Sequence, residues 1–457
     1  MENIDSNKVS EQYKKMTETP VKRLVITLAI PTILSMMVTS IYNIVDTAFV
    51  GTLGNSASGA VGIVFGLMAI LQSVGFLFGQ GSGSMLSRKL GSKDPQSASI
   101  IASTGFFCSF SLAVIIGSLC FIFIDPLIML LGSTPTIAPY AKIYIYYILV
   151  SSPFIVSSFT LNNILRYEGK ASLGMIGLLT GSILNIAGDA LFIFKLDMGI
   201  AGAGLSTAIS QVISFSLLLS MFLFGKTSSK LSVKNISIAD KTLFDIVTTG
   251  FPSLLRQSLG SLATIVLNFV SGSYGGDEAV AAMSIVNRAS FFLFAIALGI
   301  GQGFQPVCGF NYGAGKYRRL RVAYSFTLIL SEIVLIVLTF LTLIFSGNII
   351  QVFRDDPDVI MIGTRALRLL CVAQLFMPFC MVTEMLMQSS GQRTAASLLS
   401  SLRGGVLFIP ALFILPKIRG LYGVQEAQPL AFILSVLPSL YFMQRFFKNL
   451  PKEEDHI

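Results

Sequence analysis

The chain has 457 residues, of which 53% are apolar and only 12% are charged, and its mean hydropathy is +0.76. A soluble domain carries about a quarter charged residues, so this composition excludes an ordinary soluble domain and indicates a helical membrane protein. The net charge of +9 would also suit a nucleic-acid-binding protein, so the placement of the basic residues decides what it means.

Hydropathy along the chain predicts an all-α integral membrane protein with twelve transmembrane helices. The first 19 residues are polar and lack the apolar core and cleavage site of a signal peptide, so we expect a solvated tail. Runs of about 20 apolar residues, the length that crosses a bilayer, then follow one another. The predicted spans are 24–48, 57–80, 98–122, 137–160, 171–194, 199–224, 245–270, 280–304, 322–345, 364–388, 394–416 and 428–446.

The basic residues concentrate in alternate connections between these spans. Twenty-two Lys and Arg residues fall in the two tails and the even-numbered connections, whereas the odd-numbered connections hold only four. Cytoplasmic loops are the ones enriched in Lys and Arg, so both termini are predicted to be cytoplasmic in a bacterial inner membrane. The high net charge then reflects topology, and it implies no nucleic-acid partner.

A constant offset relates the two halves of the chain. Gly79-Gln80-Gly81 recurs as Gly301-Gln302-Gly303, and 301 − 79 = 222. The same offset aligns Gly54 with Gly276, Pro135 with Pro357, and Gly169 with Gly391 without gaps. Each repeat contains an even number of spans, so the predicted fold is two parallel six-helix repeats with a central cleft. The predicted parts are the tail 1–23, the bundle 24–224, a cytoplasmic linker 225–244, the bundle 245–446 and the tail 447–457.

Neither a nucleotide nor a metal is expected to drive the protein. Gly225-Lys226-Thr227 follows a membrane span and lacks the upstream glycine of a phosphate-binding loop. The five cysteines lie in apolar runs without metal-ligand spacing, so we expect packing residues and no metal site. The only histidine, His456, is penultimate, so an intramembrane proton has to be carried by a carboxylate. The Gly-Gln-Gly triplets indicate close backbone packing at helix ends.

Polar residues within the spans are the candidate functional groups, because charges are costly at bilayer depth. Tyr42 and Asp46 in the first span, and Asn185 and Asp189 in the fifth, are each spaced i, i+4 and so share a helix face. If the two faces meet, desolvation and like charge both favour a neutral carboxyl group, and a proton or a sodium ion can bind there. Pro31 supplies a possible bend in the first helix.

The repeat helps to weigh these aspartates against the alternative of satisfied polar residues near helix ends. At the offset of 222, Asp46 corresponds to Asn268 and Asp189 to Ala411, so the fold does not require a carboxylate at either position. This favours a functional role for both aspartates in the N-terminal half.

Other candidates lie elsewhere in the spans. Glu384 either binds a cationic substrate or second proton, or pairs with an arginine such as Arg256, and the sequence leaves both readings open. The remaining arginines of the C-terminal half are interpreted as snorkelling or paired residues. Asn43 is a candidate cavity residue. Met36 and Met37 are interpreted as core or lipid-facing residues, and they would suit varied hydrophobic ligands if they line the cavity.

Several motifs resemble the multidrug and toxic compound extrusion (MATE) family, and most closely its MepA-like bacterial branch. They are Ile30-Pro31, the run Tyr42-Asn43-Ile44-Val45-Asp46, Phe49-Val50-Gly51 with Leu53-Gly54, Ser87-Arg88-Lys89-Leu90-Gly91, and Asn311-Tyr312-Gly313-Ala314-Gly315. The resemblance implies that Tyr42, Asp46, Asn185, Asp189 and Thr207 form a polar cluster whose protonation is coupled to bending at Pro31. It adds Asn162 or Asn163 to that cluster. The C-terminal half lacks the additional acidic residues of sodium-coupled branches.

The leading hypothesis is a secondary antiporter, not an enzyme, that exports cationic or amphipathic organic compounds in exchange for protons or sodium. Its expected partners are small organic cations and membrane lipid, and it is expected to act as a monomer without nucleotide, nucleic acid or cofactor. A lipid-linked saccharide flippase is the alternative, because the C-terminal half is rich in arginine. A membrane enzyme acting on lipids would need a catalytic His, Cys or metal cluster, which the sequence does not offer.

Overall fold

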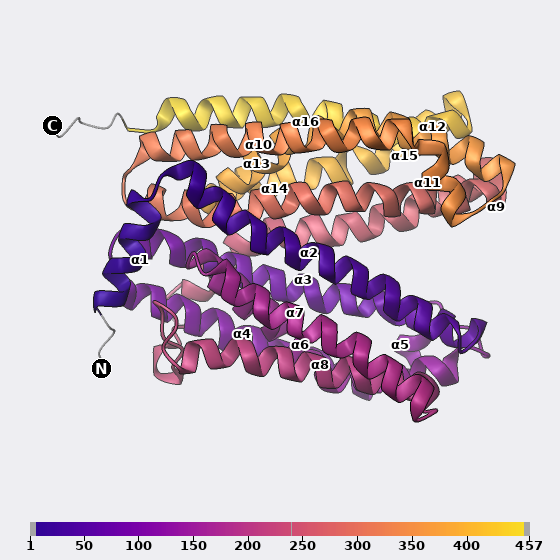
Figure 1. Cartoon of the computed structure of the whole chain (residues 1–457), viewed down its shortest axis with the longest axis horizontal. Helices are drawn as coiled ribbons and strands as arrows, with labels where there is room; N and C mark the ends of the chain where they lie inside the picture. Colours follow the sequence, from indigo (N-terminus) through magenta and orange to yellow (C-terminus); the bar gives the residue numbers. More distant parts are fainter. Residues whose placement is uncertain (1–5, 239, 452–457) are drawn as a thin grey trace. The chain divides into compact units, whose positions relative to one another are not determined.

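The structure is a computed structural model that describes residues 6–238 and 240–451. All regular structure in these residues is helical (Figure 1). Ten helices are long and apolar enough to cross a membrane, and a bent pair raises the number to eleven. The prediction of an all-α, multi-pass membrane protein is therefore confirmed.

The elements of the N-terminal half are α1 (Ser6–Glu18), α2 (Val21–Gly51), α3 (Asn55–Gly91), α4 (Pro95–Ile122), α5 (Ile124–Leu130), α6 (Ala138–Tyr167), α7 (Ala171–Asp189), the π-helix η1 (Ala190–Lys195), α8 (Gly199–Leu223) and the short 3₁₀-helix η2 (Val233–Asn235). The remaining elements are α9 (Thr242–Gly313), α10 (Tyr317–Ile344), α11 (Ser346–Phe353), α12 (Pro357–Gln374), α13 (Met377–Ser389), α14 (Arg393–Ser401), the π-helix η3 (Leu402–Val406), α15 (Phe408–Arg419) and α16 (Leu421–Asn449).

Two of these elements bear on the number of spans. Helix α9 covers the predicted spans 245–270 and 280–304, and its backbone is not helical at Gly275 and Gly276, where φ is +65° at Gly276. Helices α12 and α13 meet at a bend of 48° within the predicted span 364–388. Pro378, in the first turn of α13, lacks the amide hydrogen that would continue the helix from α12, which explains the bend. The count of twelve spans remains a prediction.

Helix boundaries confirm the internal repeat. Elements of the two halves begin or end at positions 222 residues apart, so the offset found from glycine and proline positions also fits the backbone. The matching positions are the ends Gly91 and Gly313, the starts Pro95 and Tyr317, the ends Ile122 and Ile344, the starts Ile124 and Ser346, the starts Ala171 and Arg393, and the starts Gly199 and Leu421.

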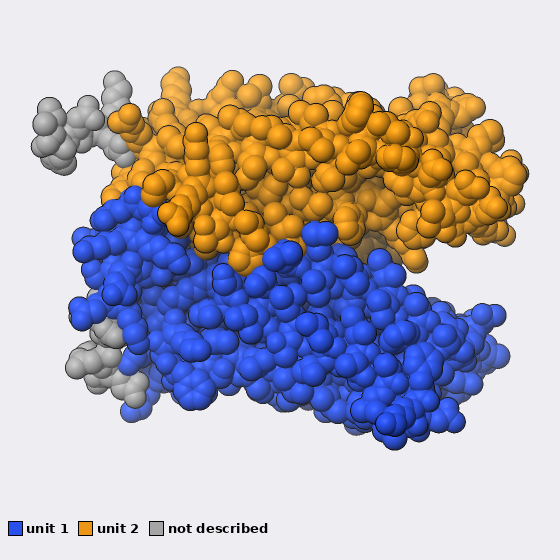
Figure 2. Space-filling view, in the orientation of Figure 1, with its two compact units in different colours: residues 1–19, 34–254 blue, residues 20–33, 255–457 orange. Residues whose placement is uncertain are grey.

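The chain packs as two compact units, coloured separately in Figure 2. Unit 1 contains residues 1–19 and 34–254, and unit 2 contains residues 20–33 and 255–457. Helix α2 is divided between the two units: its residues up to Ile33 belong to unit 2, and those from Leu34 onward belong to unit 1. The division lies just after Pro31.

Glycines of both Gly-Gln-Gly triplets lie where another backbone passes closely. A Cβ on Gly79 would lie 2.8 Å from Cβ of Asn163, and one on Gly303 would lie 2.6 Å from the backbone of Ala29. Contacts this short exclude any larger residue unless the backbone moves. The interpretation of the triplets as close-packing sites agrees with these contacts.

The N-terminal segment packs against unit 1, so the prediction of a solvated tail is wrong for its described part. Gln12 and Met16 of α1 are buried, and Gln12 Nε2 donates a hydrogen bond of 2.6 Å to the carbonyl oxygen of Glu168. Gly169 has φ of +79° and lies against Met16 and Gln12. The amphipathic spacing of α1 gives it an apolar face to bury.

The carboxylate of Glu168 binds the segment that follows α8 within unit 1. Its carboxylate is fully buried and accepts hydrogen bonds from the amides of Ser228 (2.7 Å) and Ser229 (3.0 Å), and also from the Ser229 hydroxyl. Lys170 Nζ lies 3.4 Å away and donates to the Lys226 carbonyl (2.7 Å). Burial holds the pKa of Lys170 below its ordinary value, although Glu168 opposes this shift.

Replacing Glu168 with Ala should destabilise unit 1, because two amides and a hydroxyl lose a charged acceptor in a buried site. The expected loss is on the order of 3 kcal/mol. It should appear as a lower melting temperature of the detergent-purified protein. The exposed Glu18 of α1 provides the control, since Glu18→Ala should change the melting temperature little. Equal melting temperatures for the two variants would contradict this role of Glu168.

Candidate functional site

The candidate site in unit 1 is a group of buried and half-buried polar residues from four helices, which we call the carboxylate cluster. It comprises Tyr42 and Asp46 of α2, Tyr144 of α6, Asn185 and Asp189 of α7, and Ser206 and Thr207 of α8. Asp189 is fully buried, and Asn185 and Thr207 are 2% exposed. The structure therefore brings together all five residues that the resemblance placed in one polar cluster.

The carboxyl groups of Asp46 and Asp189 lie close enough to interact electrostatically. One oxygen of Asp46 and both oxygens of Asp189 are shielded from solvent and accept no hydrogen bond from the described residues. Two ionised carboxylates repel each other at this range, and a hydrogen bond between them requires that one carries a proton. The pair therefore remains the candidate proton or cation site that the sequence predicts.

Amide and hydroxyl groups surround this pair. Asn185 Nδ2 lies 3.2 Å from Thr207 Oγ1 and 3.4 Å from Ser206 Oγ, and Ser206 Oγ donates a hydrogen bond of 2.9 Å to the Asn185 carbonyl. Asn185 Oδ1 is buried and accepts no hydrogen bond from the described residues. An amide oxygen without a donor can serve as a ligand for a cation.

Two members of the cluster were not predicted from the sequence. Tyr144 is 1% exposed, and its hydroxyl interacts with Thr207 and lies within electrostatic range of Tyr42 and Asp46. Ser206 precedes the predicted Thr207. A tyrosine hydroxyl inside the fourth span was the only available signal, and it is one of several tyrosines in the run from Tyr140 to Tyr147.

A small groove adjoins the cluster in unit 1, with a volume of about 80 Å³. Tyr42 and Asn185 line both the groove and the cluster, and Asn43 lies beside them as predicted for a cavity residue. Gln72, Gln211, Phe65, Met68 and Phe159 are also among its lining residues, and none of the lining residues is charged. Walls of aromatic, thioether and amide groups suit an amphipathic ligand.

The other predicted cavity residues lie outside this groove's lining. Asn163 is buried, and its side chain is occupied on its own helix, donating to the Phe159 carbonyl (2.7 Å) and accepting from Arg166 Nη2 (2.5 Å). Asn162 packs against Gly174. Met36 and Met37 are half-buried on α2. Their role as ligand contacts remains a prediction.

Unit 2 contains a buried group of opposite charge. Glu384 of α13 and Arg256 of α9 form an ion pair of 2.5 Å, with side chains that are only 3% and 7% exposed. The Arg403 guanidinium lies over Phe294 and Phe432, 5.5 Å and 5.8 Å from the ring centres, and interacts electrostatically with Glu384. Of the two readings that the sequence left open, the structure shows Glu384 paired with Arg256.

Both charged groups adjoin π-helical turns. Asp189 ends α7 and the π-helix η1 follows at once, while Arg403 lies within the π-helix η3. A π-turn shifts the register of a helix, and such turns are frequent at functional sites. Each turn therefore changes which residues of its helix face the charged group.

Comparisons with known proteins agree with this architecture. A family model described as MatE matches residues 31–191 and 252–414. The chain belongs to the MatE family.

Individual members of that family match nearly the whole chain. The multidrug export protein MepA of Staphylococcus aureus (strain MSSA476) is 29% identical over 419 residues, which are 91% of each chain. A MATE family transporter of the MOP superfamily, solved in an outward-facing conformation, is 26% identical and covers 95% of this chain and 97% of its own, with a TM-score of 0.90. A MATE structure in the bent conformation is 25% identical, covers 96% and 98%, and gives a TM-score of 0.89.

In this MATE transporter, replacing one member of the Arg256–Glu384 pair should destabilise the protein more than replacing both. Arg256→Gln or Glu384→Gln alone leaves a charge buried without its partner, at an expected cost of about 3 kcal/mol, whereas the double variant should recover part of that loss. Thermal unfolding of the purified protein measures both effects. The exposed Arg419–Glu426 pair (2.7 Å) is the control, because Arg419→Gln should cost under about 1 kcal/mol. Additive losses in the double variant would contradict the coupling.

Proposed function

We propose that the protein exports cationic or amphipathic organic compounds in exchange for protons or sodium ions. The observation that carries this proposal is the pair of interacting carboxyl groups, Asp46 and Asp189, in a buried site beside a groove. The name of the MepA relative supports the substrate class, and the polarity of the groove walls agrees with it.

The coupling follows from electrostatics. With both carboxylates ionised, unit 1 carries two unneutralised charges in a poorly solvated site, which favours binding of any accessible cation. A proton or sodium ion that enters from outside relieves the repulsion, and a cationic compound competes for the same negative charge. Exchange of one for the other links inward ion flow to export.

We propose that transport occurs by alternating access, in which the two bundles move relative to each other, as in other transporters built from repeats. Pro31 cannot donate a backbone hydrogen bond, so α2 can bend there at low cost. Asp46 lies on the same helix, and the membership of α2 changes from unit 2 to unit 1 just after Pro31. Ion binding at Asp46 can therefore act on the part of α2 that follows Pro31 and belongs to unit 1. The termini are assigned to the cytoplasm from the distribution of Lys and Arg.

Asp46→Asn should abolish gradient-driven export while the protein still inserts and folds, because the amide keeps the shape of the side chain but neither binds nor releases a proton. Efflux of a fluorescent organic cation from proteoliposomes measures this. Asp197→Asn is the matched control: Asp197 is exposed in the loop after η1 and should leave efflux unchanged. Normal efflux by the Asp46 variant would remove this carboxylate from the mechanism.

The coupling ion is decided by imposing one gradient at a time. We expect a proton gradient alone to drive uptake of the dye into inside-out vesicles, and a sodium gradient alone to drive little. The carboxylate cluster has two acids, whereas unit 2 pairs its buried Glu384 with Arg256. Transport driven by sodium at equal pH on both sides would overturn the assignment to protons.

A lipid-linked saccharide flippase is the second candidate function. Arg256 and Arg403 exceed Glu384 by one positive charge in the buried group of unit 2, which would suit a phosphate-bearing substrate. Accumulation of lipid-linked precursor in cells that lack the protein, together with absent dye efflux, would favour this function over drug export.

A further inference from the structure

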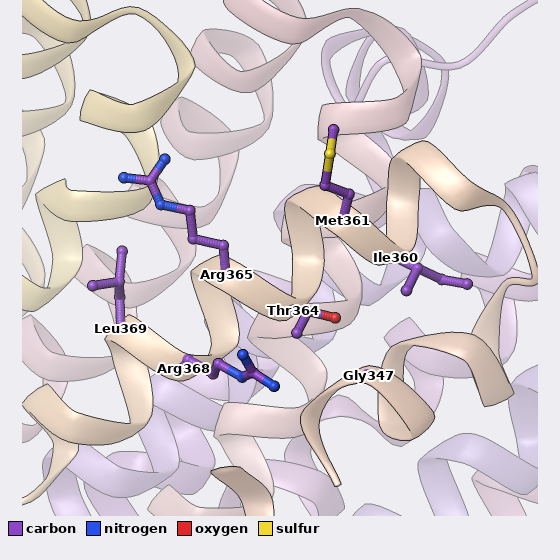
Figure 3. A pocket seen from close by; sticks show the side chains of 7 residues that line it. All are labelled: Gly347, Ile360, Met361, Thr364, Arg365, Arg368 and Leu369. Carbon is purple, nitrogen blue, oxygen red and sulfur yellow. The ribbon is translucent and has the colours of Figure 1, made fainter. Parts of the chain in front are cut away.

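A second, larger groove lies on the surface of unit 2, where the short helix α11 packs beside the start of α12. Its volume is about 570 Å³, and it is lined by Gly347 of α11 and by Ile360, Met361, Thr364, Arg365, Arg368 and Leu369 of α12 (Figure 3). Two of these side chains are positively charged and none is negatively charged. Figure 3 shows Thr364 and Arg368 on the side of α12 that faces Gly347.

The arginines retain unused hydrogen-bonding capacity. Arg368 donates from Nε to Ser346 Oγ (2.8 Å), and its two Nη groups make no hydrogen bond within residues 6–238 and 240–451. Arg365 stacks on Tyr422 at 3.7 Å from the ring centre and lies 3.5 Å from Glu426, which is also bound to Arg419. Both guanidinium groups are thus held in place by neighbours and still have donors for an anion.

The equivalent place in unit 1 carries an ion pair. At the repeat offset, Gly347 corresponds to Asp125 of α5 and Thr364 to Lys142 of α6, and these two form a contact of 2.6 Å. Gly347 and Thr364 cannot form such a pair, because neither has a charged side chain, and a Cβ on Gly347 would lie 3.7 Å from Thr364 Oγ1. The positions of Arg365 and Arg368 hold Ile143 and Tyr146 in unit 1. The shared fold therefore requires neither the groove nor its arginines.

The depth and surroundings of the groove point to lipid. Helices α12 and α13 together span 357–389, longer than the roughly 20 residues that cross the hydrocarbon, so the first turns of α12 lie at the membrane surface. On α12 and α11, Met361, Val352 and Phe353 are 67%, 85% and 52% exposed. Basic side chains beside exposed apolar ones at this level match a phosphate with acyl chains attached.

We propose that this groove binds an anionic phospholipid, whose headgroup phosphate is held by Arg365 and Arg368 and whose acyl chains lie along the apolar wall of α12. The ion pair that fills the corresponding place in unit 1 confines this site to unit 2. Zwitterionic lipids bind less well, because their own ammonium group competes for the phosphate. Free glycerol phosphate lacks the chains and does not compete.

Native mass spectrometry of the full-length, detergent-purified protein titrated with phosphatidylglycerol tests the proposal, and it requires no transport. Phosphatidylglycerol should bind at least several-fold more tightly than phosphatidylethanolamine of the same chain length. The double variant R365Q/R368Q should weaken phosphatidylglycerol binding about tenfold, because each basic residue near a lipid surface contributes several-fold to affinity. Arg354→Gln, at an exposed arginine outside the groove, is the control and should change nothing.

A second variant fills the groove without touching the arginines. The double variant G347D/T364K introduces an Asp–Lys pair into unit 2. The two positions are equivalent to those of Asp125 and Lys142, where the same fold carries this pair in unit 1. This variant should abolish phosphatidylglycerol binding while the melting temperature stays near that of the native protein. If R365Q/R368Q unfolds, R368Q alone replaces it, because Arg368 is exposed.

Three results would overturn the proposal. They are equal binding of phosphatidylglycerol and phosphatidylethanolamine, unchanged phosphatidylglycerol binding in a folded arginine variant, and unchanged binding in G347D/T364K. Displacement of the lipid by glycerol phosphate would show that the groove binds free phosphate and not a lipid.

Discussion

A charge inside the bilayer has to be neutralised by a counter-charge, a proton or an ion, and the two units of this protein meet that constraint in different ways. In unit 2, Arg256 lies 2.5 Å from Glu384, so the protein supplies the counter-charge itself. In unit 1, Asp46 and Asp189 interact with each other, and among the described residues Oδ1 of Asp46 and both carboxyl oxygens of Asp189 have no hydrogen-bond partner. Unit 1 is therefore where we propose that a proton or an ion binds.

The repeat shows that one backbone fold accommodates both ways of neutralising a buried charge. Helix boundaries keep an offset of 222 residues from the end of α3 to the start of α16, so the fold has been retained in both halves. The chemistry has changed at single positions: Asp46 corresponds to Asn268, and the Asp125–Lys142 pair corresponds to Gly347 and Thr364. Function therefore resides in side chains placed on a common scaffold, and the unchanged half acts as an internal reference for each site.

Long apolar spans and i, i+4 pairs were readable from the sequence because both depend on local geometry. A bilayer fixes the length of a spanning helix, and 3.6 residues per turn place Asn185 and Asp189 on one face. The short helices α5 and α11 and the burial of α1 were not predicted, since hydropathy detects only elements long enough to cross the membrane. Tyr144 was missed for another reason: its partner Thr207 is more than 60 residues away in the chain.

By itself the sequence determined the fold class, the internal repeat and the residues that could carry charge into the membrane, because composition, periodicity and spacing act along the chain. The tertiary structure decided which of those residues meet. It joined Asp46 to Asp189, paired Glu384 with Arg256, and left a groove at Gly347 where the other half has an ion pair. Contacts between helices distant in sequence depend on how side chains pack in three dimensions, and no local pattern encodes them.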